Sequence, residues 1–92
     1  MDSVAQIKKA MEEKKLVIGT KETIKMVKYG KVSQVFLSEN CPEEAKEDIH
    51  HLCGVGKVLV TDLSLPNTEL GITCKKPFSI SVVSIRKEAE KQ

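Results

Sequence analysis

Lysines recur in the stretch LVIGTKETIKMVKYGK, residues 16–31, at a spacing that can bind a polyanion. Lys21, Lys25 and Lys28 are spaced i, i+4 and i+7, so a helix places all three on one face. Ammonium groups that share a face attract phosphate, although a solvated helix face has the same pattern. The lysines alone therefore leave two interpretations open, a solvated surface and an anion-binding site.

The residues just before the first of these lysines favour a binding site. Gly19 allows a ligand to approach the backbone closely. Thr20 is expected to cap a helix, whose free N–H groups at the first turn can hold an anion. Glu22 places a carboxylate in the same turn, which suits recognition of a base edge better than a simple phosphate cradle. The stretch is not a Walker loop, because it lacks the second glycine and the Gly-Lys-Ser/Thr ending.

A second basic segment, CKKPFSISVV, combines two lysines with an aromatic residue. Lys75 and Lys76 precede Phe78, which either alternates with Ile80 as a core residue or forms an apolar loop tip. An apolar tip beside cations can pack on an unstacked nucleotide. The chain has one tyrosine, two phenylalanines and no tryptophan, which excludes an aromatic-rich platform for single strands.

Cysteines and histidines give no catalytic or metal pattern. Cys41, Cys53 and Cys74 contain no CxxC pair, and their odd number does not suit a disulfide framework. His50 and His51 lack the ligand spacing of a zinc finger, and no group orients a Cys–His nucleophile. We therefore expect no catalytic residue, no metal and no cofactor.

The composition is that of a globular domain. The chain has 92 residues, of which 40% are hydrophobic and 30% charged, so we expect one domain over residues 1–92 with a polar tail at 86–92. No apolar run approaches the ~20 residues that span a membrane. The N-terminus has no apolar core of a signal peptide, so a cytoplasmic location without membrane contact is expected.

Charge is unevenly distributed along the chain, although its net value is only +2. Residues 1–31 contain eight lysines against four acidic residues, and residues 70–92 contain five basic residues against two acidic ones. The intervening residues 32–69 contain two lysines against seven acidic residues. If the two basic stretches meet in the fold, one face is positive and attracts phosphate.

Hydrophobic periodicity predicts alternating helices and strands. Short apolar strands between amphipathic helices indicate a sheet covered on both faces. The fold class is therefore α/β, a single-domain three-layer α/β/α sandwich with a mixed sheet of about four strands. The expected elements are helix 3–14, strand 16–18, helix 20–29, strand 35–37, helix 43–53 closed by Gly54, strand 58–60, helix 66–73 and strand 78–85.

Four motifs together resemble a known family, the archaeal and eukaryotic ribosomal proteins of the L-seven-A-e and L-thirty-e type, which bind kink-turn RNA. The resemblance covers residues 4 to 85, and Lys21, Asn40 and Phe78 are typical of the L-thirty-e branch. It rests on IGTKETIK at 18–25, ENCPEEAKEDI at 39–49, ELG at 69–71 as the opening of a short helix, and KKPFSISVVSI at 75–85.

The resemblance implies a non-enzymatic protein that recognises a sharply bent RNA. The first motif would contact the sheared G·A pairs and the RNA backbone, and the last would form an apolar and basic loop facing a flipped nucleotide. Lys28 and Lys31 would contribute charge without direct contact. The implied RNA-binding residues are Gly19, Thr20, Lys21, Glu22, Lys25, Asn40, Lys76, Phe78 and Ile80.

The implied partner is ribosomal RNA or another kink-turn RNA, with ribosomal or other ribonucleoprotein components beside it. The chain would then be a large-subunit ribosomal protein or a ribosome-associated paralogue. The alternative is a protein-interaction module on the same fold, with the acidic helix 43–53 as its docking face. One departure is that Lys75 stands where the family commonly has glycine, which predicts a different loop shape. The acidic, glycine-containing extension of the L-thirty-e branch is replaced by a polar tail.

Overall fold

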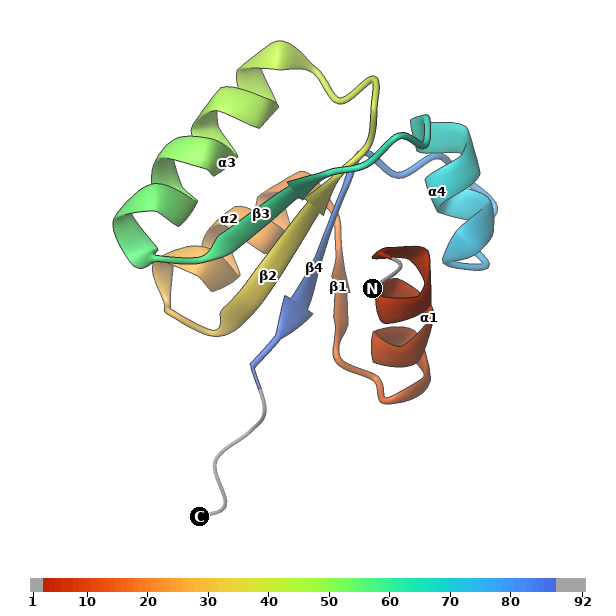
Figure 1. Ribbon diagram of the computed structural model, residues 1–92, viewed down its shortest axis with the longest axis horizontal. Helices are drawn as coiled ribbons and strands as arrows, with labels where there is room; N and C mark the ends of the chain where they lie inside the picture. Colours follow the sequence, from red (N-terminus) through yellow and green to blue (C-terminus); the bar gives the residue numbers. More distant parts are fainter. Residues whose placement is uncertain (1–2, 88–92) are drawn as a thin grey trace.

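The computed structural model describes residues 3–87, so most of the expected polar tail lies outside the described residues. Helices cover both faces of a four-stranded sheet: α2 and α3 lie on one face, and α1 and α4 on the other (Figure 1). This confirms the α/β/α sandwich. In chain order the elements are α1 (Ser3–Glu12), β1 (Leu16–Ile18), α2 (Thr20–Lys28), β2 (Val32–Leu37), α3 (Glu43–Gly56), β3 (Leu59–Asp62), α4 (Asn67–Thr73) and β4 (Val82–Arg86).

The sheet is mixed, with strand order β1-β4-β2-β3. β4 pairs antiparallel with both β1 and β2, whereas β2 and β3 are parallel. The carboxyl ends of β1, β2 and β3 therefore meet the amino end of β4 at one end of the sheet. The loops that lead into α2, α3 and α4 leave from this same end, which we call the loop end.

Alternating strand residues build a separate core under each helical layer. Val35 and Leu37 of β2 and Val82 of β4 pack on the α2 and α3 side, together with Val27 and Ile49 of those helices. Their strand neighbours lie on the other side of the sheet, because successive side chains of a strand point to opposite faces. That second core contains Phe36, Val83, Ile7, Leu63, Leu70, Cys74 and Ile80.

Several element boundaries differ from the sequence prediction, among them the start of β2, which is Val32 rather than residue 35. Gly54 does not close α3, which continues to Gly56 and ends at Lys57, whose φ of 59° is left-handed and whose N–H bonds to the Cys53 carbonyl. β4 begins at Val82 rather than at residue 78, so residues 78–81 form a loop instead of the start of a strand. The β-branched composition of this segment favoured a longer strand than its hydrogen bonding supports.

No helix within residues 3–87 is both long enough and apolar enough to cross a lipid bilayer. Over the same residues, no group of three His, Cys, Asp or Glu side chains is arranged to hold a metal ion.

The three cysteines are free and buried, and burial is the largest cause that raises the pKa of each thiol. Nearby Lys46 and Lys76 oppose this shift at Cys41 and Cys74 respectively. A protonated, buried thiol reacts slowly, because the thiolate is the nucleophile.

We expect the native protein at pH 8 to be alkylated by iodoacetamide about tenfold or more slowly than the chain in denaturant. Because the folded pKa values are raised, the native rate should increase only at higher pH than for a free cysteine. Mass spectrometry of quenched time points measures this, and fast labelling of Cys53 in native buffer would contradict the packing described here.

Candidate functional site

Backbone hydrogen bonds hold four loops together at the loop end of the sheet. The Gly19 N–H donates to the Val82 carbonyl at 2.9 Å, which joins the start of α2 to β4. The loop after β2 is joined to the loop before β4, because the Ser38 N–H donates to the Ser81 carbonyl at 2.8 Å. The start of α4 is joined to the loop before β4, because the Ile80 N–H donates to the Asn67 carbonyl at 3.0 Å. The segments that carry the two predicted RNA-contacting motifs are therefore neighbours.

Gly19 forms the entry to α2 in a backbone conformation that suits glycine alone. Its φ of 111° and ψ of 150° lie in a region that other residues occupy only with strain. An added Cβ would meet no atom within 4 Å, so the requirement comes from the backbone rather than from space. The prediction that Thr20 caps the helix is wrong: Gly19 is the N-cap, Thr20 is the first helical residue, and no side chain caps this end.

The uncapped helix end suits an incoming acceptor. The first N–H groups of a helix lack partners within the helix, and a glycine N-cap has no side chain to supply one. Glu22 lies in this first turn and is exposed. Donors from the backbone and an acceptor from the carboxylate are thus available to a ligand within one turn.

One face of α2 carries the lysines and forms a shallow hollow of about 390 Å³. Thr23 and Val27, on the opposite face, are buried against the sheet. Within the described part of the chain, none of the lysines in the hollow forms an ion pair, so their charge is available to a polyanion. The hollow is lined by Lys21, Ile24, Lys25, Lys28 and Tyr29.

Two members of this hollow were not assigned as contacts from the sequence. Tyr29 is 63% exposed beside the lysines, and only the folded helix end shows that it shares their surface. Lys28 was assigned to the supporting field, but it lines the hollow, whereas Lys31 does not.

A buried hydroxyl pair fixes α2 on the sheet. The side-chain oxygens of Thr23 and Ser84 lie 3.1 Å apart, and both residues are fully buried. This hydrogen bond orients the lysine face, because a polar pair in an apolar layer is satisfied in only one arrangement of helix and strand. Sequence reasoning missed it, because the two residues are distant in the chain.

Asn40 connects loops at this end of the sheet. Its side-chain oxygen accepts the backbone N–H of Asn67 at 2.8 Å and the Ser38 hydroxyl at 3.3 Å, while its amide nitrogen donates to the Asn67 side-chain oxygen at 3.3 Å. In this structure Asn40 positions the start of α4. Its direct contact with RNA stays a prediction, and Asn67 is the partner that sequence reasoning did not find.

In the segment before β4, some of the residues predicted to bind RNA are exposed to solvent and another is buried. Phe78 is 56% exposed and Lys76 is also exposed, as expected of a basic and apolar loop tip. Ile80 is only 3% exposed and packs in the core under α4, so its side chain supports the loop from beneath and does not face outward with Phe78. The predicted sharing of one surface by Phe78 and Ile80 is therefore wrong in this structure.

Gly71 of α4 permits the close approach of that loop. A Cβ at this position would collide with the carbonyl group of Phe78. The Lys76 N–H also donates to the Gly71 carbonyl at 2.9 Å. The ELG motif, expected to open the short helix, lies inside α4 and sets the distance between helix and loop.

Known proteins are similar to this chain in sequence and in fold. The model of the ribosomal protein L7Ae/L30e/S12e/Gadd45 family matches residues 1–92. The chain belongs to this family. Large ribosomal subunit protein eL30 of Methanocaldococcus jannaschii is 32% identical over 88 residues, covering 96% of this chain and 80% of that protein. The eL30 protein of Sulfurisphaera tokodaii is 35% identical over 81 residues, covering 88% and 76% respectively.

Solved structures share the L7Ae/L30e fold at low sequence identity. A Bacillus halodurans protein of unknown function superposes with a TM-score of 0.83 at 21% identity, covering 91% of this chain and 83% of that one. The Giardia lamblia 15.5kD RNA binding protein superposes with a TM-score of 0.75 at 19% identity, covering 96% and 78%. Family and relatives are named as ribosomal or RNA-binding proteins, and none of these names denotes an enzyme.

Lys75 stands at a position where the L7Ae/L30e resemblance leads one to expect glycine. Its φ is 60°, in the left-handed region that glycine adopts without penalty. The backbone at Lys75 thus has a conformation that glycine would adopt without strain, and a loop shape different from that of the family stays a prediction.

We expect Lys75→Gly to be more stable than Lys75→Val by about 1–2 kcal/mol, because a β-branched residue is strained at this φ. Urea denaturation of the two variants measures the difference. Equal stability would show that the loop relaxes away from the left-handed conformation.

Proposed function

We propose that this chain is an RNA-binding protein of the large ribosomal subunit, or a ribosome-associated paralogue, that recognises a kink-turn or similarly bent RNA. The archaeal relatives at 32–35% identity are named as large-subunit proteins, and the chain matches most of their length. Its place of action is then the ribosome in the cytoplasm.

One observation carries this proposal: the uncapped start of α2, with Lys21 in its first turn, lies at the same end of the sheet as an exposed aromatic loop. The lysine face extends from this end along α2. The backbone hydrogen bond from Gly19 to Val82 joins the two motifs directly. A bent RNA offers phosphates, base edges and an extruded base close together, whereas a straight duplex hides its bases. The two motifs supply one complementary group for each of these features.

Each group has a distinct task in this mechanism. The first-turn amides of α2 and Lys25 hold phosphates, which fixes the position of the protein on the RNA. Lys21 donates to base oxygens, and Glu22 accepts from amino or imino groups of the G·A pairs. Phe78 packs on the extruded base, with Lys76 beside it neutralising its phosphate. Asn40 holds the loop after β2 against the start of α4.

The direct test is to crosslink the protein to RNA in the cells that contain it and to sequence the recovered fragments. We expect ribosomal RNA segments with consecutive G·A pairs beside a bulge. A Lys21→Ala, Lys25→Ala double variant should lose these crosslinks. Recovery of unrelated RNA, or a cellular partner that the double variant retains in full, would instead support the protein-interaction alternative.

A further inference from the structure

A second basic surface lies at the end of the sheet opposite the loop end. Lys15 immediately precedes β1, Lys31 precedes β2, and Arg86 ends β4. The Arg86 N–H donates to the Lys15 carbonyl at 2.8 Å, and the Lys87 N–H donates to the Lys31 carbonyl at 2.9 Å. These bonds hold three segments, far apart in sequence, in one place. The five-residue strand β4 runs from the loop end to this surface, and its length of about 16 Å separates the two.

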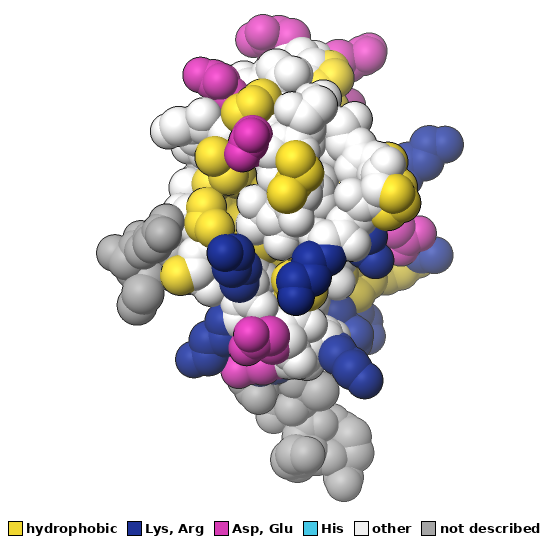
Figure 2. Space-filling view, turned by 90° about the vertical axis from the view of Figure 1, so that its right-hand side faces the viewer, with side chains coloured by type: hydrophobic (Ala, Val, Ile, Leu, Met, Phe, Trp, Pro, Cys, Tyr) yellow, Lys and Arg dark blue, Asp and Glu magenta, His cyan; other side chains and the backbone are white. Residues whose placement is uncertain are grey.

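Lysine and arginine dominate this end, which we call the distal basic cluster. Its acidic neighbours in sequence are Glu12, Glu13 and Glu88, and Glu13 is paired with Lys15 at 3.3 Å. Figure 2, which views the side of the molecule that carries α1 and α4, shows Lys and Arg side chains across its middle and lower part, around one group of acidic side chains. The cluster comprises Lys9, Lys14, Lys15, Lys31, Arg86 and Lys87.

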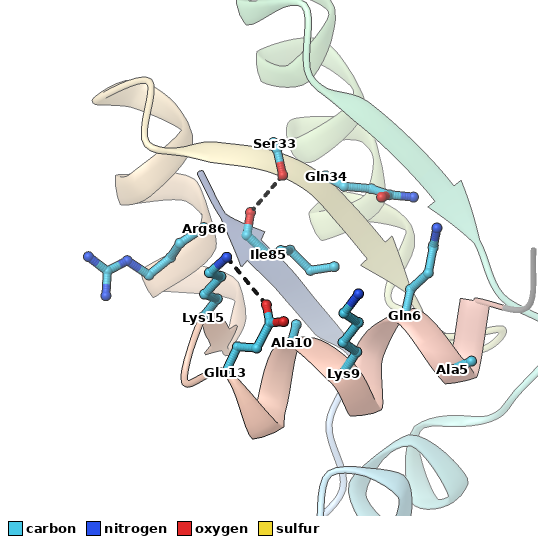
Figure 3. A pocket seen from close by; sticks show the side chains of 10 residues that line it. All are labelled: Ala5, Gln6, Lys9, Ala10, Glu13, Lys15, Ser33, Gln34, Ile85 and Arg86. Carbon is cyan, nitrogen blue, oxygen red and sulfur yellow. Dashed lines mark hydrogen bonds and ion pairs between the residues drawn. The ribbon is translucent and has the colours of Figure 1, made fainter. Parts of the chain in front are cut away.

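A groove of about 430 Å³ opens between α1 and the sheet beside this cluster. Gln6 and Lys9 extend from α1 toward β2, and Gln34 extends from β2 into the same region (Figure 3). Ala10 and Ile85 give the groove an apolar floor. The groove thus combines amide groups, three cations and the Glu13 carboxylate above an apolar base, a mixture of polar and apolar groups typical of a ligand site.

Four charged residues line the groove, and two of them, Glu13 and Lys15, form an ion pair with each other. Lys9 and Arg86 line it, and neither side chain forms an ion pair between residues 3 and 87. The chain as a whole has a net charge of only +2, yet this end contains six basic residues, with Glu12, Glu13 and Glu88 as their acidic neighbours in sequence. Such concentration of one sign attracts a polyanion.

We propose that the distal basic cluster and its groove bind a second RNA strand, so that the protein connects two RNA segments. Cations from α1, the α1–β1 turn, the α2–β2 turn and β4 form an extended array, which suits successive phosphates of a nucleic acid strand. The amides of Gln6 and Gln34 both donate and accept, which suits the 2′-hydroxyl that distinguishes RNA from DNA. This surface is independent of the kink-turn proposal, since it shares no residue with that site.

The test uses the full chain and a labelled single-stranded RNA that contains no kink-turn, with and without a saturating unlabelled kink-turn RNA. We expect Lys9→Gln with Arg86→Gln to weaken binding of the labelled strand about five- to tenfold. The slope of log affinity against log salt should fall by about 1.4, for two lost phosphate contacts. Kink-turn affinity and the thermal midpoint should stay unchanged, which shows that the variant is folded.

The matched control, Lys46→Gln with Lys57→Asn, removes the same charge from α3 and its end, outside both surfaces. It should reduce binding of the labelled strand less than twofold. Equal losses in the two double variants would overturn the proposal, as would displacement of the labelled strand by the kink-turn RNA. Competition by polyglutamate as effective as by RNA of equal charge would reassign the surface to an acidic protein. If kink-turn binding itself fails, the labelled strand alone still tests this surface.

Discussion

Lys21→Ala is expected to weaken binding of a kink-turn RNA about tenfold or more, whereas Lys31→Ala should change it less than about threefold. Lys21 lies in the first turn of α2, beside the uncapped amides and Glu22, and lines the hollow on that helix. Lys31 carries the same charge, but it lies beyond the helix and does not line the hollow. The difference therefore separates a positioned contact from a general positive field.

The two variants are matched in charge, so a filter-binding or fluorescence titration at one salt concentration compares them directly. Both should also be titrated against a plain duplex of equal length, for which their losses should be similar and small. Equal losses on the kink-turn RNA would mean that the lysines of α2 contribute only charge, and the motif would then have no role in reading RNA shape.

Gly71→Ala is expected to destabilise the protein by about 2–3 kcal/mol and to weaken RNA binding as well. The new methyl group would occupy the position of the Phe78 carbonyl group, and this neighbour is backbone rather than a flexible side chain. The loop cannot retreat freely, because Lys76 is bonded to Gly71 and Ile80 is bonded to Asn67. Any displacement that relieves the collision moves Phe78 away from its place in the candidate site.

Gly54→Ala provides the internal control for this variant. Gly54 lies inside α3, where an added Cβ would meet no atom within 4 Å, so alanine should stabilise the helix by about 0.5–1 kcal/mol. Chemical denaturation gives both free energies of unfolding. If Gly71→Ala is as well tolerated as Gly54→Ala, the contact between α4 and the loop is looser than described here.

The alternation of helices and strands was predictable because each element has its own period of apolar residues. Local sequence predicted a helix beginning beside Gly19, although it assigned the cap to Thr20, and it placed the lysines on one face because helix geometry fixes their spacing. It failed at Ile80, where an apolar alternation resembles a strand but the backbone bonds instead to Asn67 and the side chain enters the core.

Other features of the site depend on contacts between distant parts of the chain. The hydrogen bond between Thr23 and Ser84 and the link from Asn40 to Asn67 have no local signal, because in the sequence each partner alone is an ordinary polar residue. Charge counting did detect two basic stretches. It did not show that they form surfaces at both ends of the sheet, since this depends on the antiparallel direction of β4.

Recognition of RNA shape by the segment from Gly19 to Lys25 is the central claim, and one comparison tests it most directly. Affinity is measured for a kink-turn RNA and for the same RNA with its consecutive G·A pairs replaced by Watson–Crick pairs, at equal salt. We predict at least about a hundredfold loss on replacement, because two base-reading contacts and the bend disappear together. Equal affinity for the two RNAs would contradict shape recognition and leave only electrostatic attraction.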